Sequence, residues 1–333
     1  MELNLSKIPL TLAFSHYDHL TELMNGRVTV EGVDLTPLNM QIEEIFFRMI
    51  TYRDFDVSEI SMAKFSSLAS QGDSPFVGLP VFPSRVPRHS SIYIRKDGSV
   101  KQPSDLKGKR VGIPEWAQTA AVYSRGLLQH EYGVDLASIQ WVQAGVDQPG
   151  RQEKVKLKLP AGINYTPAPD KSLSGMLVSG EIDAALSAHA PTCFEEGHPN
   201  VVLMFPDYLE VEQAYVKKTG IFPIMHGVAM KREVFERHPW VAGNLMVAFE
   251  EAKRRSIRRV LNNTSSTVPI PWGYAIARRM QDIVGEELLP YGVEANRVTL
   301  DAFLQYGFEQ GVLHKRMQPE DLYPPQVQRS FKV

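Results

Sequence analysis

The first sixty residues alternate between short apolar runs and segments in which apolar positions recur with helical spacing. Apolar runs bounded by turn residues are typical of buried strands, whereas apolar positions three and four apart are typical of helices. The pattern predicts strands at 8–14, 28–35 and 55–60, and helices at 18–24 and 42–50. Because parallel strands need a crossover between them, the alternation favours a mostly parallel sheet with helices on both faces.

A second series of elements follows the proline-rich stretch 75–87, which is predicted to lead to a crossover between two parts of the molecule. The same reasoning predicts strands at 90–95, 110–113, 138–143, 182–187 and 220–230, and helices at 116–132, 173–179, 232–238 and 240–261. The polar loop 145–169 is predicted to be a lid. We expect two lobes, the first formed by 1–94 and 213–333 with a helical C-terminal tail, and the second by 95–212.

Composition agrees with a globular chain of this size. The chain has 333 residues, which is more than a single hydrophobic core usually serves. Its hydrophobic share of 43% and charged share of 22% are ordinary, and no stretch approaches the roughly 20 apolar residues of a membrane span. We therefore expect a soluble protein that does not bind membranes.

Charge and cysteine content exclude several classes of function. The 36 basic and 38 acidic side chains are mixed along the chain, so no basic stripe is available for nucleic acid. Cys193 is the only cysteine, which excludes an internal disulfide and every zinc site with several thiolates. The apolar run 8–14 is too short for the core of a secretion signal, so we expect a cytoplasmic protein.

The order of strands, helices and crossovers resembles that of type II periplasmic binding proteins, which have a two-lobed α/β fold with a ligand cleft between the lobes. Five segments, spread over nearly the whole chain, resemble more narrowly the 4,5-dihydroxyphthalate decarboxylase family. These are Phe14-Ser-His-Tyr-Asp18, Phe55-Asp-Val-Ser-Glu-Ile-Ser61, Phe82-Pro-Ser-Arg-Val-Pro-Arg-His-Ser90, Gly112-Ile-Pro-Glu-Trp-Ala-Gln-Thr119 and Thr219-Gly-Ile-Phe-Pro-Ile-Met-His226.

This resemblance implies that the protein removes CO2 from 4,5-dihydroxyphthalate to give protocatechuate. Protonation of the ring para to a hydroxyl allows CO2 to leave without a cofactor, so none is expected, and a divalent metal is left open. Because fold does not determine function, one alternative is a non-catalytic substrate-binding or sensor protein for a small carboxylate. Another is an enzyme for a different small carboxylate, such as a thiamine-precursor synthase. The expected partner is a small aromatic carboxylate, and a homo-oligomer is left open.

Such a reaction needs an acid that protonates the ring. His16, directly after the first strand, is the first candidate because imidazole titrates near neutral pH; the alternative is a surface histidine at a helix start. Glu59, at the end of a strand, and His226, within an apolar run, are the other catalytic candidates. Their alternatives are an ion pair with Lys64 for Glu59 and a core hydrogen bond for His226.

The substrate also needs donors for its carboxylates and partners for its hydroxyls. A guanidinium in the proline-rich stretch would bind a carboxylate with two parallel hydrogen bonds, and free N–H groups at the start of helix 116–132 would face an anion. A tryptophan at that helix start would stack on the aromatic ring or belong to the core. We predict the substrate-binding residues to be Ser15, Ser61, Arg88, His89, Trp116, Gln118, Thr119 and His189.

A metal site would require distant histidines to meet. His16, His189 and His226 would share an ion only if both lobes closed over it, and their separations match no local zinc spacing. We therefore predict no metal ligands.

Overall fold

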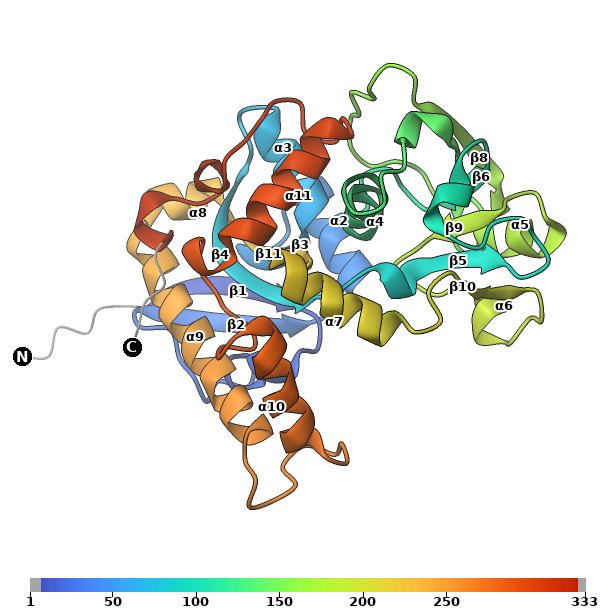
Figure 1. The fold of residues 1–333 in the computed structure, drawn as a ribbon. Coiled ribbons are helices and arrows are strands. Elements are labelled where there is room, and N and C mark those ends of the chain that lie inside the picture. The colour runs from blue at the N-terminus through green and yellow to red at the C-terminus, as the bar shows by residue number, and fades with distance from the viewer. Residues whose placement is uncertain (1–6, 329–333) are drawn as a thin grey trace, which may run out of the picture.

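The computed structural model describes residues 7–328, which form two β-sheets that lie side by side and are covered by helices (Figure 1). In the first sheet the strand order is β2-β1-β3-β11-β4. Strand β1 pairs in parallel with β2 and β3, whereas β11 runs antiparallel to both β3 and β4. The strands are β1 (Ile8–Phe14), β2 (Val33–Asn39), β3 (Val57–Ser61), β4 (Phe76–Arg85) and β11 (Ile224–Lys231).

The second sheet has the order β10-β5-β9-β6-β7-β8. Strands β9, β6, β7 and β8 are parallel neighbours, and β5 is antiparallel to both β9 and β10. The bounds are β5 (Ile92–Arg95), β6 (Arg110–Ile113), β7 (Gln140–Gly145), β8 (Asn164–Ser172), β9 (Ala184–Leu186) and β10 (Val201–Leu203). Each sheet therefore has one strand, β11 or β5, that runs against all the others, so both sheets are mixed but mostly parallel, as predicted.

Helices follow most strands, as the alternating pattern predicts. They are α1 (Thr21–Met24), α2 (Ile42–Tyr52), α3 (Met62–Ser70), α4 (Thr119–His130), α5 (Leu173–Ser179), α6 (Thr192–Glu195), α7 (Tyr208–Thr219), α8 (Arg232–Arg237), α9 (Trp240–Val260), α10 (Gly273–Val284) and α11 (Arg297–Glu309). Helices α5 and α7 end at Gly180 and Gly220, whose positive φ angles of 79° and 71° suit glycine.

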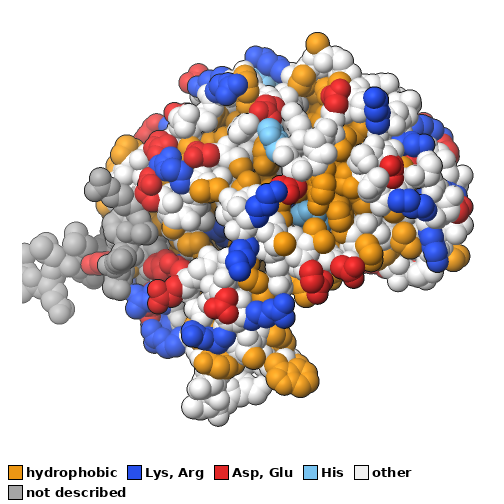
Figure 2. All heavy atoms as spheres, in the orientation of Figure 1, with side chains coloured by type: hydrophobic (Ala, Val, Ile, Leu, Met, Phe, Trp, Pro, Cys, Tyr) orange, Lys and Arg blue, Asp and Glu red, His pale blue; other side chains and the backbone are white. Residues whose placement is uncertain are grey.

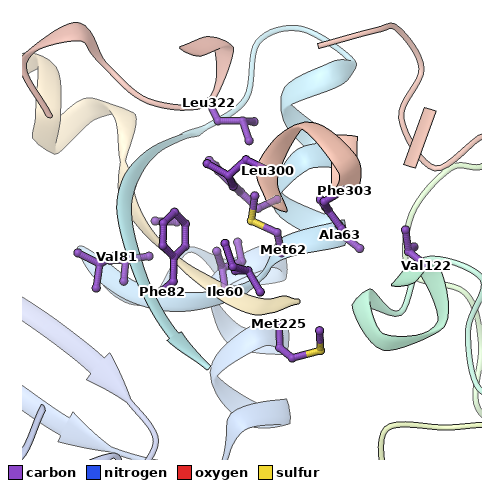
Figure 3. Close-up of a cluster of buried hydrophobic side chains, with 14 of the residues drawn as sticks. Ile60, Met62, Ala63, Val81, Phe82, Val122, Met225, Leu300, Phe303 and Leu322 are labelled. Carbon is purple, nitrogen blue, oxygen red and sulfur yellow. The ribbon is translucent and has the colours of Figure 1, made fainter. Parts of the chain in front are cut away.

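The C-terminal helix α11 packs against α4 of the second lobe and α3 of the first (Figure 1). The contact with α4 depends on Gly126, because a Cβ atom there would lie 2.2 Å from the Tyr306 ring of α11. The main hydrophobic core is continuous across the two sheets. Figure 3 shows part of it, where side chains of β3, β4 and α11 meet, among them Ile60, Phe82 and Phe303.

The structure confirms some predicted elements and corrects others. The strand 8–14 and the helix 173–179 have the predicted bounds. The second strand lies at 33–39 rather than 28–35, because Gly26 and Gly32 adopt positive φ angles and form turns before it. The proline-rich stretch 75–87 contains strand β4, which tolerates proline because it lies at the edge of its sheet. The helix predicted from Trp116 begins at Thr119.

The proposed division into lobes agrees broadly with the two sheets, although β5 already joins the second sheet at Ile92. The division itself stays a prediction. Residues 1–6, which bear on the expected absence of a secretion signal, lie outside the described residues.

On the face shown in Figure 2, acidic and basic side chains are mixed, and hydrophobic side chains gather on the protrusion formed by α9 and α10. Exposed there are Ile270, Trp272 and Ile276. Within residues 7–328, no helix combines the length and the apolar character that a membrane crossing requires.

Candidate functional site

The candidate site is centred on Glu59, a fully buried carboxylate near the end of β3. Its Oε1 accepts a hydrogen bond from the backbone N–H of Ser15 at 2.5 Å, and its Oε2 accepts one from the Tyr17 hydroxyl at 2.9 Å. Both donors follow β1, the parallel neighbour of β3, so the carboxyl ends of two adjacent strands meet at this carboxylate.

His226 completes this group from the other side of β3. Strand β11 runs antiparallel to β3 with His226 opposite Ser61, which places the imidazole at the same sheet edge. Its Nδ1 lies 3.1 Å from Glu59 Oε2 and 3.1 Å from the Tyr17 hydroxyl oxygen. The Phe46 ring packs against the imidazole in a T-shaped arrangement, with 4.9 Å between ring centroids. We call Tyr17, Glu59 and His226 the Glu59 cluster.

The protonation pattern of the Glu59 cluster follows from its geometry. Burial, and then the charge of Glu59, raise the pKa of Tyr17 above its ordinary value, so the phenol stays protonated and donates. An ionised Glu59 is satisfied best when His226 also donates to it through Nδ1–H. The Nε2 atom then points away from Glu59 and is available to a ligand. A carboxylate that orients an imidazole in this way prepares it for proton transfer.

Two predicted residues connect the lobes beside the Glu59 cluster. The Ser61 Oγ and the Thr119 Oγ1 lie 3.0 Å apart, and Thr119 Oγ1 also accepts a hydrogen bond from the Ala63 N–H at 3.1 Å. Next to Thr119, the buried Oε1 of Gln118 lacks a hydrogen-bond partner within the described residues. The structure thus brings these two predicted segments together, and Gln118 has an acceptor without a partner there among the described residues; their role in substrate binding stays a prediction.

Arg88 and His89 lie on the crossover between β4 and β5, and both are buried. The Arg88 Nε contacts the sulfur of Met225 at 3.2 Å, and Nη1 donates to Ser91 Oγ at 3.2 Å. Burial lowers the pKa of Arg88 to about 10, which leaves it charged at neutral pH. His89 faces Tyr132 and other aromatic rings, and burial lowers its pKa to about 4, so it is a neutral core residue.

Three other predicted residues do not join the Glu59 cluster. Trp116 is fully buried, donates from Nε1 to the Gln310 carbonyl at 2.7 Å and lies under the Arg125 guanidinium, so no face of its ring is left for a ligand. His16 is exposed and lines a surface hollow of about 220 Å³. The His189 side chain is 73% exposed and lies 4.0 Å from Glu43.

Within residues 7–328, no group of three or more His, Cys, Asp or Glu side chains is placed to hold a metal ion. The histidines that the sequence suggested for such a site therefore do not form one.

The loop between β7 and β8 connects both lobes. Arg151 binds Glu115 at 2.8 Å and reaches Glu43 of α2 at 3.2 Å. Lys64, buried at the start of α3, binds the same Glu115 at 2.9 Å. Burial alone would raise the pKa of Glu115, but these cations, with Lys154, hold it below its ordinary value. The predicted loop 145–169 is too long, because residues 164–169 belong to β8, and its role as a lid stays a prediction.

Sequence reasoning missed Tyr17 and Phe46. Tyr17 stands two residues after Ser15, so strand alternation would have placed both on one side of the chain, opposite His16. Phe46 gave no signal, because nothing in the helical pattern of α2 distinguishes a ring that faces His226 from one in the core.

Comparison with known proteins finds relatives that cover most of this chain. The chain is 38% identical over 330 residues to a 4,5-dihydroxyphthalate decarboxylase of Comamonas testosteroni, covering 99% of this chain and 100% of that one. It is 42% identical over 204 residues to a protein of the same name from Pseudomonas putida, covering 61% and 79%. Residues 87–155 match the family described as NMT1/THI5 like.

Among solved structures, the aliphatic sulphonate binding protein SsuA of Escherichia coli aligns with a TM-score of 0.55 at 12% identity, over 96% of this chain and 98% of that one. This likeness confirms the predicted two-lobed periplasmic-binding-protein-like fold.

Proposed function

The chain belongs to the 4,5-dihydroxyphthalate decarboxylase family, and from this premise we propose that it removes CO2 from 4,5-dihydroxyphthalate, or a close hydroxylated aromatic dicarboxylate, to give protocatechuate. The observation that carries the proposal is the Glu59 cluster, a carboxylate-oriented imidazole at the boundary between the lobes. Substrate binds in the cleft that forms there when the lobes open.

In the proposed reaction His226 is the acid. Its Nε2–H gives a proton to the ring carbon that bears the departing carboxylate. The hydroxyl para to that carbon gives its proton to solvent, and its C–O group becomes a ketone carbonyl. The carbon–carboxylate bond then breaks, CO2 leaves, and the bonding electrons restore the aromatic ring. The oxygen regains a proton, and solvent reprotonates His226, so the net change is uptake of one proton and release of CO2. Glu59 stabilises the cationic imidazole, and Tyr17 keeps the carboxylate oriented.

The hydroxyls and carboxylates of the substrate need partners beside this acid. We assign Gln118 Oε1, a buried acceptor without a partner in the described chain, to a phenolic hydroxyl. Ser61 and Thr119, which bind each other across the lobe boundary, exchange that bond for substrate oxygens. The backbone of Ser15 holds Glu59. His16, His89, Trp116 and His189 have no role in this scheme.

The test is direct. Purified protein is incubated with 4,5-dihydroxyphthalate, and protocatechuate is followed by liquid chromatography, with and without a chelator. We expect turnover in the wild type and a loss of at least about 100-fold in H226Q, the size typical of a removed general acid. His238→Gln, at the end of α8, is the matched control and keeps full activity. If H16Q abolishes turnover while H226Q retains it, the assignment of the acid is wrong.

A second candidate is a non-catalytic binding protein or sensor for a small carboxylate, which the likeness to SsuA favours. Binding of the substrate without turnover would support it. Cytoplasmic location and a homo-oligomeric state are also proposals, to be tested by cell fractionation and by analytical ultracentrifugation.

A further inference from the structure

Arg88 is a buried cation whose present partners are weak. Within the described residues its guanidinium contacts a thioether sulfur and a hydroxyl, and neither is an anion. Glu212 acts on it electrostatically, but the Oε1 of Glu212 already accepts hydrogen bonds from the N–H and the hydroxyl of Ser90. Arg88 thus has a negative charge nearby but no hydrogen bond to a carboxylate within the described residues, so its guanidinium keeps donors for an anionic ligand.

Another enclosed arginine shows what a purely structural role looks like. Arg85, the last residue of β4, donates to the carbonyl oxygens of Pro290 at 2.9 Å and Phe222 at 3.4 Å and to Asn296 Oδ1. Its guanidinium thus donates to three neutral oxygens, whereas that of Arg88 donates to one hydroxyl and one thioether sulfur. The difference indicates that Arg88 is kept for a ligand rather than for the fold.

Beside Ser91, the hydroxyl partner of Arg88, lies Ser187, whose hydroxyl has no hydrogen-bond partner in the described chain. Ser91, which accepts the Arg88 hydrogen bond, also accepts the Ser187 N–H through its carbonyl at 3.1 Å. Ser187 follows β9, the neighbour of β5, and its buried Oγ lacks a partner in the described chain. A guanidinium and two hydroxyls on adjacent strand ends are suitable donors for a carboxylate.

Arg88 lies on the connection between β4 of the first sheet and β5 of the second. Met225, which contacts Arg88, immediately precedes His226, and Figure 3 shows its side chain at the start of β11, on the side that faces α4. Arg88 therefore contacts the residue that precedes the proposed proton donor in β11, at a register shift of this strand against β4. We call Arg88, Ser91 and Ser187 the Arg88 seat.

We propose that the Arg88 seat binds the carboxylate that the substrate keeps, and so selects aromatic dicarboxylates and retains the monocarboxylate product. The inference rests on the proposed function. A cation on the departing carboxylate would stabilise the ground state and lose its partner as CO2 forms, which would slow the reaction. The same cation on the carboxylate that stays does not slow the loss of CO2, and it orients the ring.

The experiment compares two ligands that differ in that carboxylate. Protocatechuate carries it and catechol lacks it, and binding of each is measured by calorimetry to the wild type, R88Q, R88K and S187A. We expect the wild type to bind protocatechuate about 10- to 100-fold more tightly than catechol, the range of a charged hydrogen bond. R88Q brings this ratio close to one, R88K gives an intermediate ratio because it keeps the charge without the planar fork, and S187A lowers the ratio a few-fold.

Arg85→Lys is the matched control, because it weakens the fold but leaves the ratio of the two affinities unchanged. If folded R88Q keeps the wild-type ratio of protocatechuate to catechol affinity, the proposed seat is wrong. If R88Q does not fold, an unchanged ratio in S187A has the same meaning. Binding of protocatechuate that depends on Arg88, in a protein that does not turn over 4,5-dihydroxyphthalate, supports the seat and refutes the decarboxylase. Turnover of 4,5-dihydroxyphthalate by R88Q with an unchanged KM supports the decarboxylase and refutes the seat.

Discussion

Replacement of Glu59 by glutamine removes a buried negative charge while keeping the size of the side chain. The carboxylate is fully buried and accepts hydrogen bonds from Ser15, Tyr17 and His226. The amide of E59Q keeps one oxygen acceptor, but it no longer neutralises a cationic imidazole 3.1 Å away. A hydrogen bond to a charged group contributes about 1.5–3 kcal/mol, so we expect kcat to fall roughly 10- to 150-fold.

The KM for 4,5-dihydroxyphthalate should change less than about threefold, because Glu59 acts through His226 and does not touch the substrate. Steady-state kinetics of E59Q, H226Q and the double variant give a second readout. If Glu59 acts through the imidazole, E59Q costs little once His226 is absent, so the two effects are not additive. Full additivity, or a kcat for E59Q within a factor of two of the wild type in a folded protein, would refute the reasoning.

Three further predictions concern stability and closure. G126A places a Cβ atom 2.2 Å from the Tyr306 ring and should lower the free energy of unfolding by about 1–3 kcal/mol, measured in urea; no loss would show that the α4–α11 contact is not tight. His89 is neutral in the folded state, with a pKa near 4 against 6.5 when unfolded, so the unfolded chain binds the extra proton and stability falls as pH decreases from 6.5 toward 4. This loss amounts to at most about 3 kcal/mol, and H89Q should abolish it in urea titrations at the two pH values. E43Q removes the exposed partner of Arg151 across the lobes, and such an exposed ion pair contributes less than about 1 kcal/mol. We therefore expect KM to rise no more than about fivefold at constant kcat. A larger rise would mean that closure of the loop depends on this ion pair.

Local pattern was sufficient for many elements and misleading for several strands, among them β2, β4 and β8. Strand 8–14 and helix 173–179 were predicted with the right bounds, because a short apolar run and a helical apolar stripe are properties of neighbouring residues. Strand β4 was predicted as part of a crossover because of its prolines. Proline is excluded only from strands that are paired on both sides, and the position of β4 at the edge of its sheet depends on the whole topology.

The sequence by itself determined the two-lobed α/β class, the family resemblance, and the candidacy of Glu59 and His226, because strand ends and an unexpected imidazole in an apolar run are visible in one dimension. Only the tertiary structure decided that these two residues are partners, since the antiparallel register of β3 and β11 joins positions far apart in the chain. It also decided that Tyr17 rather than His16 faces them, and that Trp116 and His89 lie in the core. Burial and hydrogen-bond partners depend on which segments pack together, and no local pattern of residues contains that information.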